Sequence, residues 1–337
     1  MSETMNCHID VIATTISGSV SDWGKVKRIV PLFAGLGMTD VSLFEADSHA
    51  AAREKARELL LSGSRTIISA GGSGTFANIL EGCYDSGCDL SGLRLGFLRK
   101  GSADLIGKTL GMPDEIEAAI DVFVHAIRDN RVVPCDVLLA SSDSGDVRPR
   151  HFIGYGGAEI FGEIPYFTEN RFIKYYKGLL GQLFGDIGPF FVGTNLAVLS
   201  RIPRRLRGRK TRWEISVDDA LVSEGYFQAM IIVNGDLGPD LPFARSEPLG
   251  SGCFHLFAFR DMGFFNLYRQ LKHAFDATIM DDPERWGFES FRIMKNLELR
   301  PATDDIFPVN VDGSTMNCEG SVRFEISDTI QLLSRQG

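Results

Sequence analysis

Short apolar runs alternate with segments of helical spacing along the first 140 residues. Of the helical segments, Asp22–Ala34 gathers its apolar positions on one face, and Ala50–Leu61 is rich in the helix formers Ala, Leu, Glu and Arg. The apolar runs are bounded by turn residues, as buried strands are; they are Ile9–Ala13, Val41–Phe44, Thr66–Ala70, Leu93–Leu98 and Val132–Ala140. This alternation predicts a parallel sheet with helices on its flanks.

The pattern changes after residue 135, where glycine-rich and aromatic stretches dominate. Turn signals at Asn234-Gly235 and Asp312-Gly313 separate strand-like runs, which are Trp213–Val217, Tyr226–Val233, Cys253–Phe259 and Val322–Ile326. Helical patterns are fewer: Lys174–Phe184, Gly188–Leu199 and Phe264–Phe275. We therefore predict an α/β plus β protein. A Rossmann-like parallel sheet with flanking helices covers residues 1–135, a mostly antiparallel β-sandwich covers 136–326, and residues 327–337 are a segment that could return to the first domain.

Composition narrows the class of protein. With 44% hydrophobic and 23% charged residues, both parts can bury a core. The net charge of −9 argues against nucleic acid as a partner. The six cysteines and six histidines show no zinc-ligand spacing, and the cysteines suit a reducing cytoplasm. No signal-peptide pattern and no run of about 18 apolar residues is present, so we expect a cytoplasmic protein.

A glycine-rich loop ends the strand predicted over residues 66–70. It reads Gly71-Gly72-Ser73-Gly74-Thr75, and a helical pattern begins at Thr75. Glycines let backbone N–H groups approach an anion without interference from Cβ atoms, and the N-terminus of the next helix adds partial positive charge. The alternative is a turn that needs only positive φ angles. The position between a strand and a helix favours a phosphate site.

Several blocks resemble, in the same order, the signatures of the diacylglycerol, sphingosine and ceramide kinase superfamily, which has an NAD kinase-like fold. The segment Gly71–Gly82 is similar to the Gly-Gly-Asp-Gly-Thr-x-Asn-Glu-x-x-x-Gly signature. A second block, Leu95–Asp104, is followed by Leu110-Gly-Met-Pro113 as in the family. The remaining blocks are shorter: Ser17-Gly18, Asp136, Asn234-Gly235, Pro242–Ala244 and Val311–Gly313.

The resemblance implies a kinase that uses ATP and Mg²⁺ to phosphorylate a primary hydroxyl of a membrane lipid. It implies Asp104 and Asp312 as catalytic residues and Asp136 as a metal ligand. Three blocks would hold the nucleotide, through Ser17, Gly71, Gly72, Ser73, Gly74, Thr75, Gly101 and Ser102. Because Gly101-Ser102-Ala103-Asp104 resembles the Gly-Ser-x-Asp variant of ceramide kinases, a ceramide-like lipid is favoured over diacylglycerol or a sphingoid base.

Several acidic positions of the family pattern are altered, which leaves a second reading open. The replacements are Ser73, Asn78, Leu105, Gly250-Ser251-Gly252 and Ser314. Phosphoryl transfer depends on positioning and on neutralising charge, so lost carboxylates should be costly. The alternative is therefore a weak or inactive pseudokinase that binds nucleotide or lipid. A soluble-substrate kinase of the NAD kinase type is a third reading, which the aromatic second domain disfavours.

An apolar segment next to a basic one suggests contact with a membrane. Phe190 and Phe191 lie in the apolar stretch 188–199. Seven cations follow between residues 201 and 212 without an acid, and among them are Arg204, Arg205, Arg207 and Arg209. Such a pair suits peripheral binding to the anionic cytoplasmic face of a membrane. The alternative is a solvated loop beside a core helix.

Overall fold

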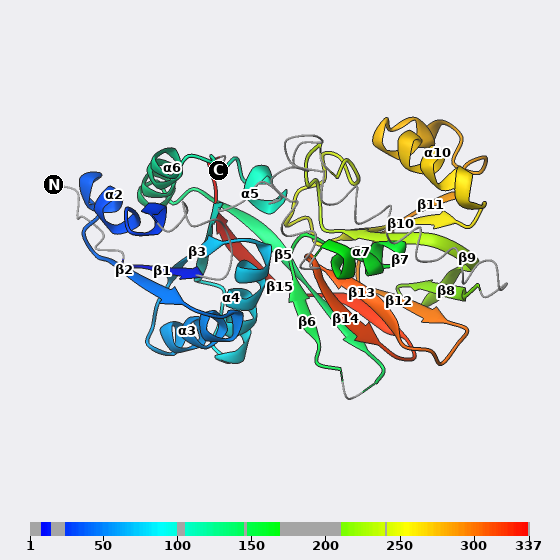
Figure 1. The fold of residues 1–337 in the computed structure, drawn as a ribbon, viewed down its shortest axis with the longest axis horizontal. Coiled ribbons are helices and arrows are strands. Elements are labelled where there is room, and N and C mark those ends of the chain that lie inside the picture. Colours follow the sequence, from blue (N-terminus) through cyan, green and yellow to red (C-terminus); the bar gives the residue numbers. More distant parts are fainter. Residues whose placement is uncertain are drawn as a thin grey trace. The chain divides into compact units, whose positions relative to one another are not determined.

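The computed structural model describes residues 8–14, 24–99, 105–144, 147–168, 210–239 and 241–335. The chain forms two compact units, one of residues 1–135 with 329–337 and the other of residues 136–328 (Figure 1). Among the helices of the described ranges, none has both the length and the apolar character needed to cross a bilayer.

The first unit is built on a parallel sheet with the strand order β15-β4-β3-β1-β2. Its strands are β1 (Ile9–Thr14), β2 (Val41–Ala46), β3 (Thr66–Gly71), β4 (Arg94–Arg99) and the end of β15 (Val322–Leu333). β1 and β3 are buried along their whole length. The parallel sheet predicted from the alternating apolar runs is thus confirmed.

Helices cover both faces of this sheet: α2 (Ile29–Gly35), α3 (His49–Leu61), α4 (Ser73–Asp85), α5 (Leu105–Thr109) and α6 (Ile116–Arg128). Figure 1 shows α2 and α6 on one face and the contacting pair α3 and α4 on the other. The helix predicted over residues 50–61 is confirmed as α3, which the Ser48 hydroxyl caps by accepting the Ala51 N–H at 3.1 Å. In the described part of 22–34, a turn at residues 27–28 precedes α2, so the main helix begins later than predicted.

The second unit contains two antiparallel sheets that share the long strand β9 (Ala220–Val233). One sheet joins β6, β5, β15, β12, β8 and the first half of β9, and the other joins β14, β13, β7, β9, β10 and β11. The other bounds are β5 (Val132–Ser142), β6 (Arg150–Phe152), β7 (Tyr155–Glu159), β8 (Arg212–Val217), β10 (Phe254–Arg260), β11 (Phe288–Ile293), β12 (Asn296–Pro301), β13 (Phe307–Val311) and β14 (Ser314–Cys318). The helices are α7 (Ile160–Thr168), α10 (Phe264–Phe275) and the 3₁₀ turn η2 (Thr278–Asp281).

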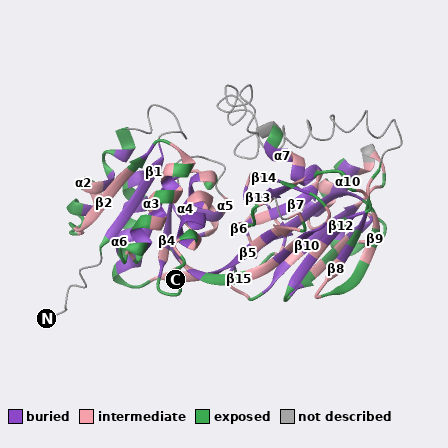
Figure 2. Cartoon of the chain, turned by 90° about the horizontal axis from the view of Figure 1, so that it is seen from below, coloured by how far each residue is buried: buried purple, intermediate pink, exposed green. Residues whose placement is uncertain are grey.

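Side chains from both sheets bury one apolar core, and the buried residues run along the strands in Figure 2. Trp213 of β8 meets Phe307 of β13 edge to face, with ring centroids 5.1 Å apart. The predicted mostly antiparallel second part is confirmed, as is the helix Phe264–Phe275. The helices predicted at 174–184 and 188–199 lie outside the described residues.

Candidate functional site

The first unit has a topological switch point between β1 and β3. These strands are parallel neighbours, with Ala13 opposite Ala70 near their carboxyl ends. The helix after β1, α2, and the helix after β3, α4, lie on opposite faces of the sheet (Figure 1). In open α/β sheets, ligands bind in the crevice outside the carboxyl ends of strands at such a point. The glycine loop follows β3 and therefore begins at this edge.

The glycine loop forms the start of α4. Gly72 is the N-cap residue, with φ −91° and ψ −177°, and the helix begins at Ser73, two residues earlier than the sequence pattern predicted. The Thr75 and Phe76 N–H groups donate to the Gly72 carbonyl oxygen at 3.0 and 3.1 Å. The Ser73 and Gly74 N–H groups lie in the first turn, where no intrahelical acceptor exists. They face outward from the positive end of the helix dipole, as an anion site requires.

Gly71 and Gly72 serve different purposes. A Cβ atom at Gly71 would lie 2.4 Å from the Thr75 Oγ1 atom, so packing excludes any side chain there. A Cβ atom at Gly72 would have no described atom within 4 Å, and its φ angle suits any residue. Neither packing nor conformation among the described residues requires glycine at position 72. Its bare backbone instead leaves the helix N-terminus open to a ligand.

Polar side chains fix the loop from within the fold. The Thr75 hydroxyl is fully buried and lies 2.7 Å from the Thr14 hydroxyl at the end of β1. The Asn78 side-chain amide donates to the Gly74 carbonyl oxygen at 2.8 Å. Thr75, predicted as a nucleotide ligand, is thus engaged by β1 through its hydroxyl and by Gly72 through its N–H. Ser73, in contrast, is exposed at the helix start.

The second predicted block, Leu95–Asp104, begins in β4, whose carboxyl end lies beside that of β3. β4 is paired with β3 so that Arg99 lies opposite Gly71, and α5 begins at Leu105. Gly101, Ser102 and Asp104 lie outside the described residues, as does Ser17 after β1. Their roles stay predictions; of the described residues, Thr14 contacts Thr75 and Arg99 lies opposite Gly71.

In the second unit, Asp136 and Asp312 belong to one buried hydrogen-bond network. Asn234 links them, because its side-chain amide donates to the carbonyl oxygens of Asp136 at 2.7 Å and Ile153 at 2.8 Å. The Asp136 Oδ2 atom accepts the Gly252 N–H at 2.7 Å, so the segment 250–252 is held by this carboxylate. The order of the family blocks thus identified residues that do come together. The network itself could not be read from the sequence.

Asp312 anchors a turn of the backbone. Its carboxylate accepts the N–H groups of Ile153 at 2.9 Å, Gly154 at 3.1 Å and Tyr155 at 2.9 Å. Burial raises the pKa of Asp312 to about 6, while these three N–H donors act to lower it. Asp312 and Gly313 both have positive φ, so the predicted turn is the two-residue link between β13 and β14.

Asp136 and Asp312 do not form a ready Mg²⁺ site. A hard cation such as Mg²⁺ needs carboxylate oxygens with free lone pairs directed at one point. Both oxygens of Asp312 face backbone N–H donors, and Oδ2 of Asp136 is bound to Gly252. These residues therefore do not fit a metal in the arrangement described. Asp312 is placed to hold the fold of the second unit, and its predicted catalytic role gains no support from this geometry.

An apolar pocket that the sequence analysis did not locate lies in the second unit. It measures about 440 Å³ and is formed by β10, β11, α10, η2 and the segment after β9. Most of its lining is apolar, from Phe243, Phe257, Ala274, Ala277, Ile279, Met280, Phe288 and Phe291. Arg245, His255 and Arg292 supply charged or polar groups. Such a lining suits a hydrocarbon chain attached to a polar group.

Comparison with known proteins agrees with this architecture. Residues 8–138 match the family model of the diacylglycerol kinase catalytic domain. A diacylglycerol kinase of Staphylococcus saprophyticus is 26% identical over 51% of this chain and 55% of its own length, and one of Staphylococcus haemolyticus is 25% identical over 58% and 59%. The chain thus spans little more than half the length of these curated relatives.

Solved structures extend the likeness in fold to nearly the whole chain. A diacylglycerol kinase from Bacillus anthracis superposes with a TM-score of 0.64 at 17% identity, covering 97% of this chain and 96% of its own. An NAD kinase from Archaeoglobus fulgidus, solved with ATP, gives 0.52 at 14% identity, covering 97% and 94%. Residues 8–138 therefore match a diacylglycerol kinase catalytic domain in sequence, and the chain has the fold of these kinases.

Proposed function

We propose that this protein is an ATP-dependent lipid kinase that phosphorylates a primary hydroxyl of a two-chain membrane lipid. The observation that carries the proposal is the open helix N-terminus at Gly72, at the switch point of a domain that matches diacylglycerol kinases. Diacylglycerol is the leading substrate because the relatives carry that name. Ceramide is the second candidate, and it rests on the Gly101–Asp104 motif alone.

The glycine loop would bind the phosphates of ATP. The Ser73 and Gly74 N–H groups and the exposed Ser73 hydroxyl supply donors at the start of the helix. In the transfer, the lipid hydroxyl oxygen bonds to the γ-phosphorus while the bond to the β–γ bridging oxygen breaks and ADP leaves. The hydroxyl proton needs an acceptor, and Asp104 is the residue we propose for it.

The second unit would hold the lipid. Its pocket of about 440 Å³ has an aromatic and aliphatic lining that suits an acyl chain. We further propose that Phe190 and Phe191, with Arg204, Arg205, Arg207 and Arg209, bring the protein to the anionic cytoplasmic face of a membrane. These residues lie outside the described part of the chain, and their role is proposed from their sequence pattern.

A nucleotide-binding pseudokinase is the second candidate function. It is favoured by Asp312, whose carboxylate is occupied by backbone donors, and by Ser73 in place of the acidic residue of the family loop. In this version the glycine loop still binds a nucleotide, and phosphoryl transfer is lost. Measurement of transfer distinguishes the two functions.

The test is a transfer assay with the purified full chain. Labelled ATP and Mg²⁺ are incubated with mixed micelles that contain diacylglycerol, ceramide or sphingosine, and phosphorylated lipid is measured. Phosphorylated diacylglycerol or ceramide would support the kinase function, and the lipid that is phosphorylated would identify the substrate. ATP binding without any lipid product would contradict the kinase and support the pseudokinase.

A further inference from the structure

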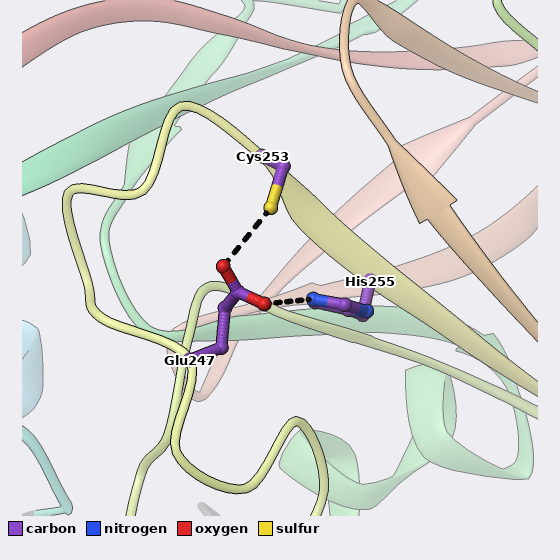
Figure 3. A group of neighbouring side chains, drawn as sticks. All are labelled: Glu247, Cys253 and His255. Carbon is purple, nitrogen blue, oxygen red and sulfur yellow. Dashed lines mark hydrogen bonds and ion pairs between the residues drawn. The ribbon is translucent and has the colours of Figure 1, made fainter.

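A cysteine, a histidine and a glutamate of the second unit meet on one face of β10. Cys253 directly precedes β10 and His255 lies two residues on, so both side chains project from the same face of the strand. The opposite face, with Phe254 and Leu256, belongs to the sandwich core. Glu247 reaches the pair from the preceding loop, and Figure 3 shows the Cys253 and His255 side chains directed at its carboxylate.

The spacing of the three groups is that of metal ligands. The Cys253 Sγ atom lies 3.5 Å from Glu247 Oε1, and the His255 Nε2 atom lies 3.5 Å from Glu247 Oε2. All three ligand atoms fall within 4.8 Å of one another. Tetrahedral zinc bonds of about 2.0–2.3 Å place neighbouring ligand atoms about 3.3–3.8 Å apart. The cluster could therefore close on a zinc ion with small side-chain movements.

The imidazole of His255 adds an independent indication. Its Nε2 atom is buried and has no hydrogen-bond partner among the described residues, because its contact with Glu247 is long and lacks hydrogen-bond geometry. A buried polar atom without a partner is unfavourable by about 1–3 kcal/mol, so such atoms usually have an occupant. Here the unsatisfied nitrogen faces a carboxylate and a thiol, which are the other donors that zinc prefers.

A cation already lies beside the cluster. Arg292 pairs with His255 across β10 and β11, and its guanidinium donates to Cys253 Sγ at 3.1 Å and to Glu247 at 3.3 Å. The Arg292 side chain is 55% exposed, so it can leave toward solvent without disturbing the core. Its positive charge balances Glu247 now, and an ion bound to Glu247 would take over that role.

We propose that Glu247, Cys253 and His255 form a binding site for a zinc ion, with a fourth position open to water. Thiolate, imidazole and carboxylate together select a borderline-soft cation such as Zn²⁺ over Mg²⁺ or Ca²⁺, which take oxygen ligands. Binding breaks the S–H bond of Cys253, forms a metal–sulfur bond and releases the proton to solvent. The proposed site belongs to the second unit, whereas the proposed phosphate loop belongs to the first.

The site would stabilise a loop that holds Asp136. Glu247 and Cys253 bracket the segment 248–252, and the Gly252 N–H in that segment donates to the Asp136 carboxylate. His255 and Arg292 also line the apolar pocket. An ion joining Glu247 to β10 would therefore fix both the Asp136 network and one part of the pocket wall.

Cobalt serves as a spectroscopic substitute for zinc in the test. The metal-free full chain is titrated with Co²⁺, and the thiolate-to-cobalt charge-transfer absorption is followed before Zn²⁺ is added to displace it. We expect one equivalent of Co²⁺ to give this band and Zn²⁺ to remove it. Cys88→Ser, which alters a partly exposed cysteine of the first unit, should behave like the wild type, whereas Cys253→Ser should lose the band.

Because Cys253 is buried, Cys253→Ser could lose the band by misfolding, so a second variant is needed. Glu247→Gln keeps the thiol and the imidazole, and Glu247 is partly exposed. Since losing even an outer-shell partner costs about 10- to 100-fold in metal affinity, Glu247→Gln should weaken Zn²⁺ binding at least about tenfold. No thiolate band in the wild type, or an unchanged band in Cys253→Ser, would overturn the site. If Glu247→Gln binds Zn²⁺ as tightly as the wild type, Glu247 is not a ligand of the proposed site.

Discussion

The hydroxyl of Thr14, the last residue of β1, lies 2.7 Å from the hydroxyl of Thr75 in the first turn of α4. This contact joins the two strands of the switch point through the helix whose N-terminus forms the proposed phosphate site. It therefore fixes the position of the first-turn N–H groups relative to the sheet. A loop held in this way is preorganised for an anion.

The Thr14–Thr75 contact predicts a measurable coupling. Thr75→Val removes one hydroxyl and leaves the other buried, so we expect a loss of about 1–3 kcal/mol in the free energy of unfolding. The double variant Thr14→Val, Thr75→Val should lose less than the sum of the single variants. Urea unfolding of the four proteins measures this. Strictly additive losses would show that the two hydroxyls do not interact.

A buried ion pair holds α4 against α3. Arg53 is 18% exposed and lies 3.1 Å from the buried Glu81, and it also pairs with Asp85. Arg53→Met removes the cation that pairs with the buried Glu81, so we expect a loss of about 3 kcal/mol in stability. The matched control is Arg57→Met, on the same helix, whose pair with Glu54 is solvent-exposed and should matter little. Equal effects of the two variants in denaturant unfolding would contradict this.

Asp312 should make stability depend on pH. Its folded pKa of about 6 lies above its ordinary value of 3.8, so the folded state binds its proton more tightly than the unfolded state. The resulting stabilisation is complete below about pH 3.8 and is lost as the pH rises through about 6. Unfolding free energies of the wild type relative to Asp312→Asn should therefore fall between pH 4.5 and about 6.5. A difference that grows with pH would mean that the three N–H donors outweigh burial.

The basic segment predicts selective binding to anionic vesicles. Each basic residue near an anionic surface is worth about 1 kcal/mol, so replacing Arg204, Arg205, Arg207 and Arg209 by Gln should weaken binding at least about tenfold. Phe190→Ala with Phe191→Ala should weaken binding to neutral and anionic vesicles alike. Co-sedimentation measures both. Equally poor binding of the wild type to neutral and anionic vesicles would contradict the proposed contact with a membrane.

The parallel strands of the first unit could be predicted from the local pattern of apolar residues. Parallel strands are buried on both faces, so β1 and β3 appear in the sequence as mostly apolar runs, interrupted by Asp10 and Ser69. β11 and β12 were not predicted, because their short runs alternate apolar with charged residues and their pairing depends on distant partners. Glu298 of β12, for example, pairs with Ser216 on one side and Arg323 on the other.

The sequence indicated the glycine loop and the turn at Asp312, but it did not indicate the contacts that hold them. The family blocks led to Asp312, but its backbone donors at 153–155 lie 157 to 159 positions away in the sequence. Gly71 and Gly72 look equivalent in sequence, and only the neighbouring Thr75 distinguishes their roles. Cys253 and His255 were set aside for lack of ligand spacing, yet their partner Glu247 comes from a loop that folds back on the strand.

The proposed kinase function requires that the backbone at Gly72 admits the phosphates of ATP. The direct test is calorimetric ATP binding to the wild type, Gly72→Val and the control Gly35→Val, since both glycines have open space around them among the described residues. All three proteins should unfold within about 0.5 kcal/mol of one another. We predict that Gly72→Val binds ATP at least about tenfold more weakly, because the side chain would block the helix N-terminus, and that Gly35→Val binds normally. Equal affinities of the wild type and a folded Gly72→Val would contradict the account.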